Sequence, residues 1–313
     1  MRKIYFILIA LLLLEACADG GGGSVGESAA TKVSYHKLAK EKFERKAPFD
    51  SVLALQQKAV EELRAGTSPD HAVGVLQQMG YFYTRSGQYG LGADFLLEAV
   101  DSLNRQTTLN EEDRLNAAYL FGNLSNLYVR MGMYDEALES NMLGLQYSEG
   151  LDNMLACNLW RMRGNLFEHM EMPDSLLRCY DMAMAETHGN RRLIASVVVD
   201  RGEYIVMHSD KFSTDEVRET LRVLENSDYE GLPMKDAAKF AIGKGKIMFG
   251  DTIGGLKIME EVLESTRERQ DFEMLQFAEK HLLTAYAKTG RVEKLAPLFP
   301  EYDALCDTLM NRE

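Results

Sequence analysis

The sequence predicts an all-α fold, a stack of helical hairpins, on three observations. An aromatic residue followed by Gly-x-Tyr and then by a small residue occurs at Tyr83–Gly92 and again at Tyr128–Ala137. The positions at which hairpins would turn recur about every 40 residues. No segment shows the sustained period-two alternation that is typical of a half-buried strand. A recurring helix–turn–helix unit of this kind usually builds a stacked array that binds rather than catalyses.

The first residues have the pattern of a processing segment. Arg2 and Lys3 precede an unbroken apolar run, Ile4–Leu14, which is shorter than the roughly 20 residues that a spanning helix needs. The run ends in Leu14-Glu15-Ala16-Cys17. This resembles the bacterial lipoprotein box, in which the cysteine is lipidated and becomes the new N-terminus, although Glu15 departs from the small or apolar residue usual there. The resemblance implies a signal peptide over 1–16 and lipidation of Cys17; an ordinary secretory signal is the alternative.

Residues 17–34 are expected to be a tether between the lipid and a folded part over 35–313. Gly20–Ser24 contains no side chain that could pack, so this stretch should behave as a flexible coil. No later segment approaches 18 consecutive apolar residues. We therefore expect a protein of the bacterial cell envelope, held at the outer membrane or the periplasmic face by its N-terminal lipid only.

The folded part begins with two helical segments. Residues 35–46 are strongly charged and form either a helix or an approach arm. Pro48 interrupts this segment, and Asp50 is expected to cap the next helix, in which apolar residues recur at helical spacing. Gly66 is expected to end that helix.

Six regular helix pairs follow. Their turns are predicted at Gly87, Gly132, Met172-Pro173, Ser209–Ser213, Gly250 and Gly290. The pairs are predicted at about 70–86 with 90–104, 111–131 with 134–148, 152–170 with 174–187, 191–208 with 214–226, 234–249 with 252–268, and 272–289 with 292–310. Pro173 suits the first position of a helix, and Pro297 and Pro300 should distort the last helix.

The pairs carry residues of a known repeat. The third reads Trp160-x2-Arg163-Gly164-x2-Phe167 and then Leu176-x3-Tyr180-x2-Ala183. This resembles the tetratricopeptide repeat, whose pattern is Trp-x2-Leu-Gly-x2-Tyr followed by Ala-x3-Phe. The resemblance covers most of 70–310 and implies a right-handed α-solenoid of about six to seven hairpins. The period near 40 exceeds the 34 residues of that repeat, and the fourth and fifth pairs keep few signature residues, so an irregular all-helical domain is the alternative.

The charge and the cysteines exclude some classes of function. A net charge of −13 disfavours a nucleic-acid partner, because phosphates need Lys and Arg for neutralisation. After Cys17 only Cys157, Cys179 and Cys306 remain, without a Cys-x-x-Cys pair. Small buried core residues are the favoured interpretation, and a Cys157–Cys179 disulfide is the alternative.

No catalytic or metal-binding pattern is present. Gly243–Lys246 lacks the rest of a phosphate-binding loop, and the six His residues show no metal-ligand spacing. We therefore expect neither an enzyme nor a cofactor or metal site.

The candidate binding residues follow from the repeat resemblance, which implies that the first helix of each pair lines a concave groove. Polar residues recur there at spacings that place them on one helix face. They are Gln77, Tyr81 and Arg85 in the first pair, Tyr119, Asn123, Asn126 and Arg130 in the second, and Asn158, Arg161 and Asn165 in the third, with Glu168 following. Arg and Asn can hold carboxylates and peptide backbone. A solvated polar face without a ligand is the alternative.

These observations favour a lipid-anchored envelope scaffold that binds a protein or peptide in the groove. A second hypothesis is a periplasmic sensory input domain, because Tyr302–Asp307 resembles the end of the periplasmic repeat region of some helix-turn-helix regulators and sensor kinases. A third is glycan capture, as in some repeat-containing outer-membrane lipoproteins.

Overall fold

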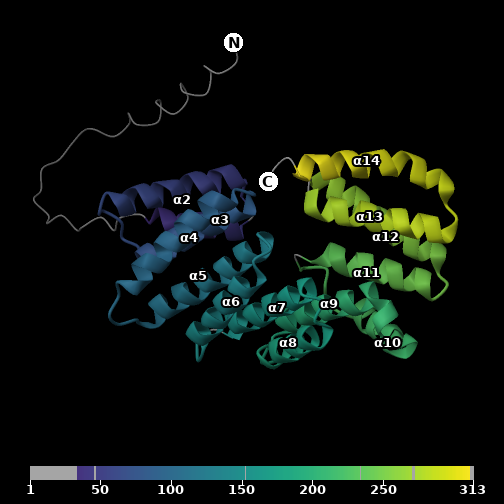
Figure 1. The fold of residues 1–313 in the computed structure, drawn as a ribbon, viewed down its shortest axis with the longest axis horizontal. Helices are drawn as coiled ribbons and strands as arrows, with labels where there is room; N and C mark the ends of the chain where they lie inside the picture. The colour runs from purple at the N-terminus through teal and green to yellow at the C-terminus, as the bar shows by residue number, and fades with distance from the viewer. Residues whose placement is uncertain (1–33, 46, 152, 233, 270–271, 311–313) are drawn as a thin grey trace, which may run out of the picture. The chain divides into compact units, whose positions relative to one another are not determined.

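The computed structural model describes residues 34–45, 47–151, 153–232, 234–269 and 272–310, and the account below concerns these residues. They belong to one compact unit, Ser34–Glu313, which is drawn from purple to yellow in Figure 1. The expected signal segment, the lipidation residue Cys17 and nearly all of the tether lie outside the described residues.

The described residues contain helices and no strand, as the sequence predicts. The helices are α1 (Tyr35–Glu44), α2 (Phe49–Arg64), α3 (Ala72–Arg85), α4 (Tyr89–Asn104), α5 (Glu111–Arg130), α6 (Tyr134–Ser148), α7 (Asn153–His169), α8 (Pro173–Ala185), α9 (Arg191–Met207), α10 (Thr214–Glu225), α11 (Lys235–Met248), α12 (Thr252–Arg269), α13 (Phe272–Thr289) and α14 (Val292–Met310), with a short 3-10 turn at Ser209–Lys211.

The helices pack as seven consecutive hairpins, from α1 with α2 to α13 with α14. Each second helix also contacts the first helix of the next hairpin. The first helices of five hairpins, α3, α5, α7, α9 and α11, contact one another in that order. Their exposed faces form one continuous surface, which we call the first-helix row. This stack of hairpins confirms the predicted α-solenoid.

Glycines allow the two helices of a hairpin to approach closely. A Cβ placed on Gly80 of α3 would lie 2.6 Å from the Leu96 side chain of α4, and one on Gly164 of α7 would lie 3.0 Å from the Tyr180 ring of α8. Gly87, Gly132, Gly250 and Gly290 adopt positive φ at the turns, where a side chain would be strained. The recurring glycines therefore serve two purposes: some allow close packing of the two helices, and others allow the turn between them.

Apolar clusters fill the space within and between hairpins. The largest joins α7, α8, α9, α10 and α11 and contains Cys157, Tyr180, Val206 and Leu224. Cys157 and Cys179 are buried and free, so the alternative of a disulfide between them is not what the structure contains. Cys306 is free and half-buried.

Two local predictions differ in detail from the structure. Residues 35–44 form a helix, and Ser34, which we assigned to the tether, caps it by accepting a hydrogen bond from the Lys37 N–H. The prediction that Asp50 caps α2 is wrong, because Pro48 occupies the N-cap and Asp50 lies in the first turn. Pro297 and Pro300 both lie inside α14, as expected, and the helix continues through them.

Candidate functional site

The structure brings the predicted residues onto neighbouring first helices. Gln77 of α3 is buried, and its Oε1 accepts a hydrogen bond of 2.6 Å from Nδ2 of Asn123 on α5. The two predicted rows are therefore in register. Gln77 itself joins the helices and presents little surface to a ligand.

The other two residues on α3 lie against the first hairpin. The guanidinium of Arg85 donates to the Tyr81 hydroxyl at 3.3 Å and lies 5.6 Å from the centre of the Phe43 ring on α1. The Tyr81 ring contacts Phe43 edge to face. These contacts fix the positions of both side chains, and Arg85 stays exposed at its tip.

The remaining residues on α5 differ in their surroundings. Tyr119 is half-buried beside Leu155 and Leu159 of α7. Arg130 is exposed and its Nη1 donates to the Tyr89 hydroxyl at 3.5 Å. Asn126 is half-buried, and its side chain has no hydrogen bond to any described residue. Asn126 is thus free to receive a ligand.

Hydrogen bonds connect the predicted polar residues of α7 to α9 and to one another. Nε of Arg161 donates to Oδ2 of Asp200 at 2.7 Å, and Nη1 donates to Oδ1 of Asn158 at 3.0 Å. The side chains of Arg161 and Asp200 are only 14% and 12% exposed, so the guanidinium is already neutralised. Asn165 accepts from the Tyr180 hydroxyl at 2.9 Å and is exposed. The amide NH₂ groups of Asn158 and Asn165 donate to no described residue.

Helix α9 adds carboxylates to the row that were not among the predicted binding residues. Glu203 lies one turn after Asp200; the charge of Asp200 raises the pKa of Glu168 on α7, and the charge of Glu168 raises that of Glu203. Burial raises the pKa of Glu203 to about 8, and the like charges of Asp200 and Glu168 contribute. Burial also raises the pKa of Asp200, while Arg161 opposes that shift. Continuing the same register into 191–208 would have identified these residues.

A lysine follows the carboxylates along the row, with a neutral histidine of α13 near it. Nζ of Lys244 on α11 donates to the Met207 carbonyl at 2.5 Å, and burial lowers the pKa of Lys244. Burial lowers the pKa of His281 on α13 to about 4, and the neighbouring charge of Lys244 adds to the shift. The first-helix row therefore changes from amide groups to carboxylates and then to the single cation of Lys244.

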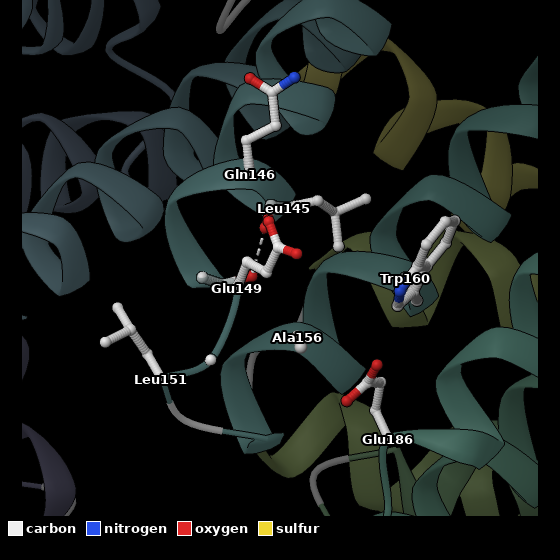
Figure 2. A pocket seen from close by; sticks show the side chains of 9 residues that line it. Leu145, Gln146, Glu149, Leu151, Ala156, Trp160 and Glu186 are labelled. Carbon is white, nitrogen blue, oxygen red and sulfur yellow. Dashed lines mark hydrogen bonds between the residues drawn. The ribbon is translucent and has the colours of Figure 1, made fainter.

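A separate cavity of about 310 Å³ lies where α6 and α8 end beside α7 (Figure 2). Trp160 and Ala156 of α7, Leu145 of α6 and two glutamates line it. The complete lining is Leu145, Gln146, Ser148, Glu149, Gly150, Leu151, Ala156, Trp160 and Glu186. None of these residues belongs to the predicted binding rows.

The part of the chain that the structure describes contains neither a candidate metal cluster nor a candidate membrane span. No group of three or more His, Cys, Asp or Glu side chains there could hold a metal ion. Among the same residues, no helix is both long and apolar enough for a membrane span.

Comparison with known proteins identifies the fold. No family model matches the chain, and no curated protein matches it by sequence. Among solved structures, the apo form of RapI is similar, with a TM-score of 0.64 and 13% identity over 88% of this chain and 98% of that chain. A Rap protein complexed with competence and sporulation factor has a TM-score of 0.63 and 13% identity over 89% and 76% of the two chains. BtubC from P. vanneervenii has a TM-score of 0.53 and 16% identity over 72% and 93%.

These similarities are at the level of the fold. The chain is an all-α, tetratricopeptide-like repeat solenoid, in agreement with the repeat resemblance in its sequence.

Proposed function

We propose that this chain is a scaffold whose first-helix row binds an extended protein or peptide segment. The observation that carries the proposal is the continuity of the row, in which Gln77 bonds to Asn123 across α3 and α5 and Arg161 bonds to Asp200 across α7 and α9. These bonds fix the row before a ligand arrives, and preorganisation lowers the cost of binding.

Free amide groups on the fixed row would supply the contacts. Asn126, Asn158 and Asn165 present NH₂ groups that bond to no described residue. Such donors suit the carbonyl groups of an extended peptide backbone. Because Arg161 is paired with Asp200, we assign it to positioning the row rather than to gripping a carboxylate of the ligand.

The similar structures support this proposal at the level of the fold. One of them is a Rap protein complexed with competence and sporulation factor. A solenoid of this type can therefore take a partner. That complex, with its bound factor, also favours a second candidate, a sensory input domain that detects a ligand.

Site-specific photo-crosslinking in intact cells tests the proposal. A photoreactive residue at Asn126 or Asn165 should capture the same discrete species, whereas one at Leu97 or Glu139, exposed on second helices, should not. If the crosslinked product is only slightly heavier than the protein alone, the captured species is a free peptide, which favours the sensory role. A large increase in mass would indicate a resident protein and favour the scaffold. Equal capture from all four positions would contradict binding at the first-helix row.

A double variant supplies the matched control. Asn126→Ala with Asn158→Ala should reduce capture at Asn165 about tenfold or more, on the basis of about 0.5–1.5 kcal/mol for each lost hydrogen bond. Its helical circular dichroism should be unchanged, since neither amide is part of the core. Arg161→Ala is unsuitable for this purpose, because it would leave the buried carboxylate of Asp200 without its partner.

Location at the envelope is part of the proposal and rests on the N-terminal pattern of Arg2, Lys3, the apolar run Ile4–Leu14 and Cys17. A lipid on Cys17 would confine the row to one membrane surface and raise its effective concentration toward a neighbouring partner.

A further inference from the structure

The cavity beside Trp160 is separate from the first-helix row. Residues on an α-helix are rotated by about 100° from one to the next. Ala156 and Trp160 therefore lie on the side of α7 away from Asn158, Arg161 and Asn165. The cavity is reached between the second helices α6 and α8, and its occupant would not compete with a segment on the row.

The walls of the cavity suit an apolar stem. Leu145 and Ala156 line it, together with the half-buried ring of Trp160 (Figure 2). The guanidinium of Arg163 lies 5.7 Å from the centre of the Trp160 ring, and Arg163 is not part of the lining. The volume of about 310 Å³ is at the small end of ligand pockets, which favours a single side chain as the occupant.

The electrostatics of the cavity suit a cation. Glu149 is the C-cap of α6 and Glu186 is the C-cap of α8, so each carboxylate sits where a helix carries partial negative charge. Neither helix has a basic residue in its last turn, whereas α2, α3 and α5 end with Arg64, Arg85 and Arg130. Two acidic C-caps facing one space oppose the helix dipoles, and a cation between them would relieve that cost.

Arg114 is the described cation at the end of α6, and it bonds to the backbone there rather than to either carboxylate. Neither Glu149 nor Glu186 forms an ion pair with a described residue. Arg114 donates to the backbone carbonyl of Glu149 at 2.5 Å, which fixes the end of α6. Figure 2 shows both side chains extending toward the space that the Trp160 ring bounds.

We propose that this cavity binds a lysine or arginine side chain presented by a partner protein. The alkyl stem would lie along Leu145 and Trp160, and the charged end would lie between the carboxylates of Glu149 and Glu186. The aromatic ring adds a cation–π attraction, which is strongest for tryptophan. This site is independent of the proposed function of the first-helix row.

Trp160 makes the test direct, because it is the only tryptophan in the chain. The full protein is titrated with the capped tripeptide acetyl-Gly-Lys-Gly-amide, its arginine analogue, and a neutral analogue with norleucine, while Trp160 fluorescence is followed. The lysine and arginine probes should give a saturable change that weakens with added salt. The norleucine probe should bind at least fivefold more weakly.

Matched variants complete the experiment. Glu149→Gln with Glu186→Gln should lower the affinity for the lysine probe about tenfold or more. Glu136→Gln with Glu139→Gln, which changes exposed residues of α6 outside the cavity, should leave the affinity unchanged. Equal binding of the neutral and basic probes, or an unchanged affinity in the Glu149/Glu186 variant, would overturn the proposal. Loss of probe binding in the Asn126/Asn158 variant would show that the two sites are not separate.

Discussion

At the scale of single residues, the closest approach of backbones lies in the hairpin of α11 and α12. A Cβ on Gly255 would lie 2.4 Å from the Gly243 carbonyl oxygen and 3.0 Å from the Ile247 nitrogen. Both are backbone atoms, so neither can move away as a flexible side chain would. By contrast, a Cβ on Gly90, near the start of α4, would meet nothing within 4 Å.

We therefore expect opposite effects from the same substitution at these two positions. Gly255→Ala should lower the free energy of unfolding by about 1–3 kcal/mol, because overpacking forces the helices apart. Gly90→Ala should raise it by about 0.4–1 kcal/mol, since alanine restricts the unfolded chain at no steric cost. Urea denaturation of both variants measures the effects. A stabilised Gly255→Ala variant would contradict the close packing of this hairpin.

The acidity of Glu203 gives a second prediction at this scale. Its pKa in the folded protein is about 8, above the ordinary value of 4.5. Between these two values the folded state holds a proton that the unfolded state has lost, so stability should fall as pH rises from about 4.5 to 8. Glu203→Gln should flatten this fall and be more stable than the parent at pH 8, by on the order of 1 kcal/mol.

Urea denaturation at a series of pH values measures this dependence. Glu219→Gln is the control, because its pKa is shifted in the opposite direction, lowered by the hydrogen bond from Arg222. Glu219→Gln should not flatten the fall in stability. A parallel pH profile for the parent and Glu203→Gln would show that Glu203 is ionised throughout.

At the scale of elements, α5 has the most complete N-terminal cap. The Asn110 side chain accepts from the Asp113 N–H at 2.9 Å, and the Asp113 carboxylate accepts from the Asn110 N–H at 3.2 Å. Asn110→Ala should cost about 1 kcal/mol of stability, while Asn110→Asp should cost little, because aspartate caps as well as asparagine.

The N-cap of α4 provides a comparison when the thermal midpoints of variants at the two N-caps are measured. Gln88 occupies that position without a side-chain capping hydrogen bond. Gln88→Ala should therefore change the thermal midpoint far less than Asn110→Ala. Equal shifts for the two variants would indicate that the capping box does not stabilise α5.

The elements also show how much of this fold the sequence determines. Positive-φ glycines such as Gly87 and Gly132 mark four of the six predicted turns, and apolar spacing marks the helices on either side, so the hairpins could be predicted. Asp50 was misassigned, because an acidic residue in a first turn looks the same in sequence as an N-cap. The rows on α5 and α7 could be read from helical spacing. The carboxylates of α9 were missed, because its hairpin retains few of the repeat's signature residues.

The cavity beside Trp160 illustrates what no sequence pattern predicts. It requires the ends of α6 and α8 to meet over α7, and its residues are spread from Leu145 to Glu186. Likewise, the pairing of Arg161 with Asp200 depends on the packing of two first helices. Such features arise between elements, whereas spacing within one element reports only which residues share a face.

At the scale of the whole molecule, the proposed lipid decides where the array is found. We expect Cys17→Ser to move the protein from the detergent phase to the aqueous phase in phase partitioning, whereas Cys306→Ser should have no effect. Acyl chains contribute about 0.8 kcal/mol for each buried CH₂, which makes the anchored form strongly membrane-bound. Mass spectrometry that finds Cys17 unmodified in the mature protein would exclude the anchor.

The pattern of contacts also predicts how the array unfolds. Helices with extensive contacts are neighbours or next neighbours along the chain, so the described part of the molecule has a nearly one-dimensional set of interfaces. In such arrays, stability is roughly a sum of local terms, and one region can open without the rest. Leu282, fully buried in the cluster of α11–α14, and Leu120, fully buried in that of α3–α5, provide matched probes at the two ends.

Hydrogen exchange of Leu282→Ala and Leu120→Ala tests this. Each truncation should destabilise its own cluster by about 2–5 kcal/mol. Leu282→Ala should accelerate exchange in α11–α14 and leave α3–α6 close to the parent, and Leu120→Ala should do the reverse. Equal acceleration along the whole array in both variants would mean that the hairpins unfold as one cooperative unit. The local outcome would leave the first-helix row of α5–α9 intact when the C-terminal hairpins open, and binding at Asn126 and Asn158 should then survive Leu282→Ala.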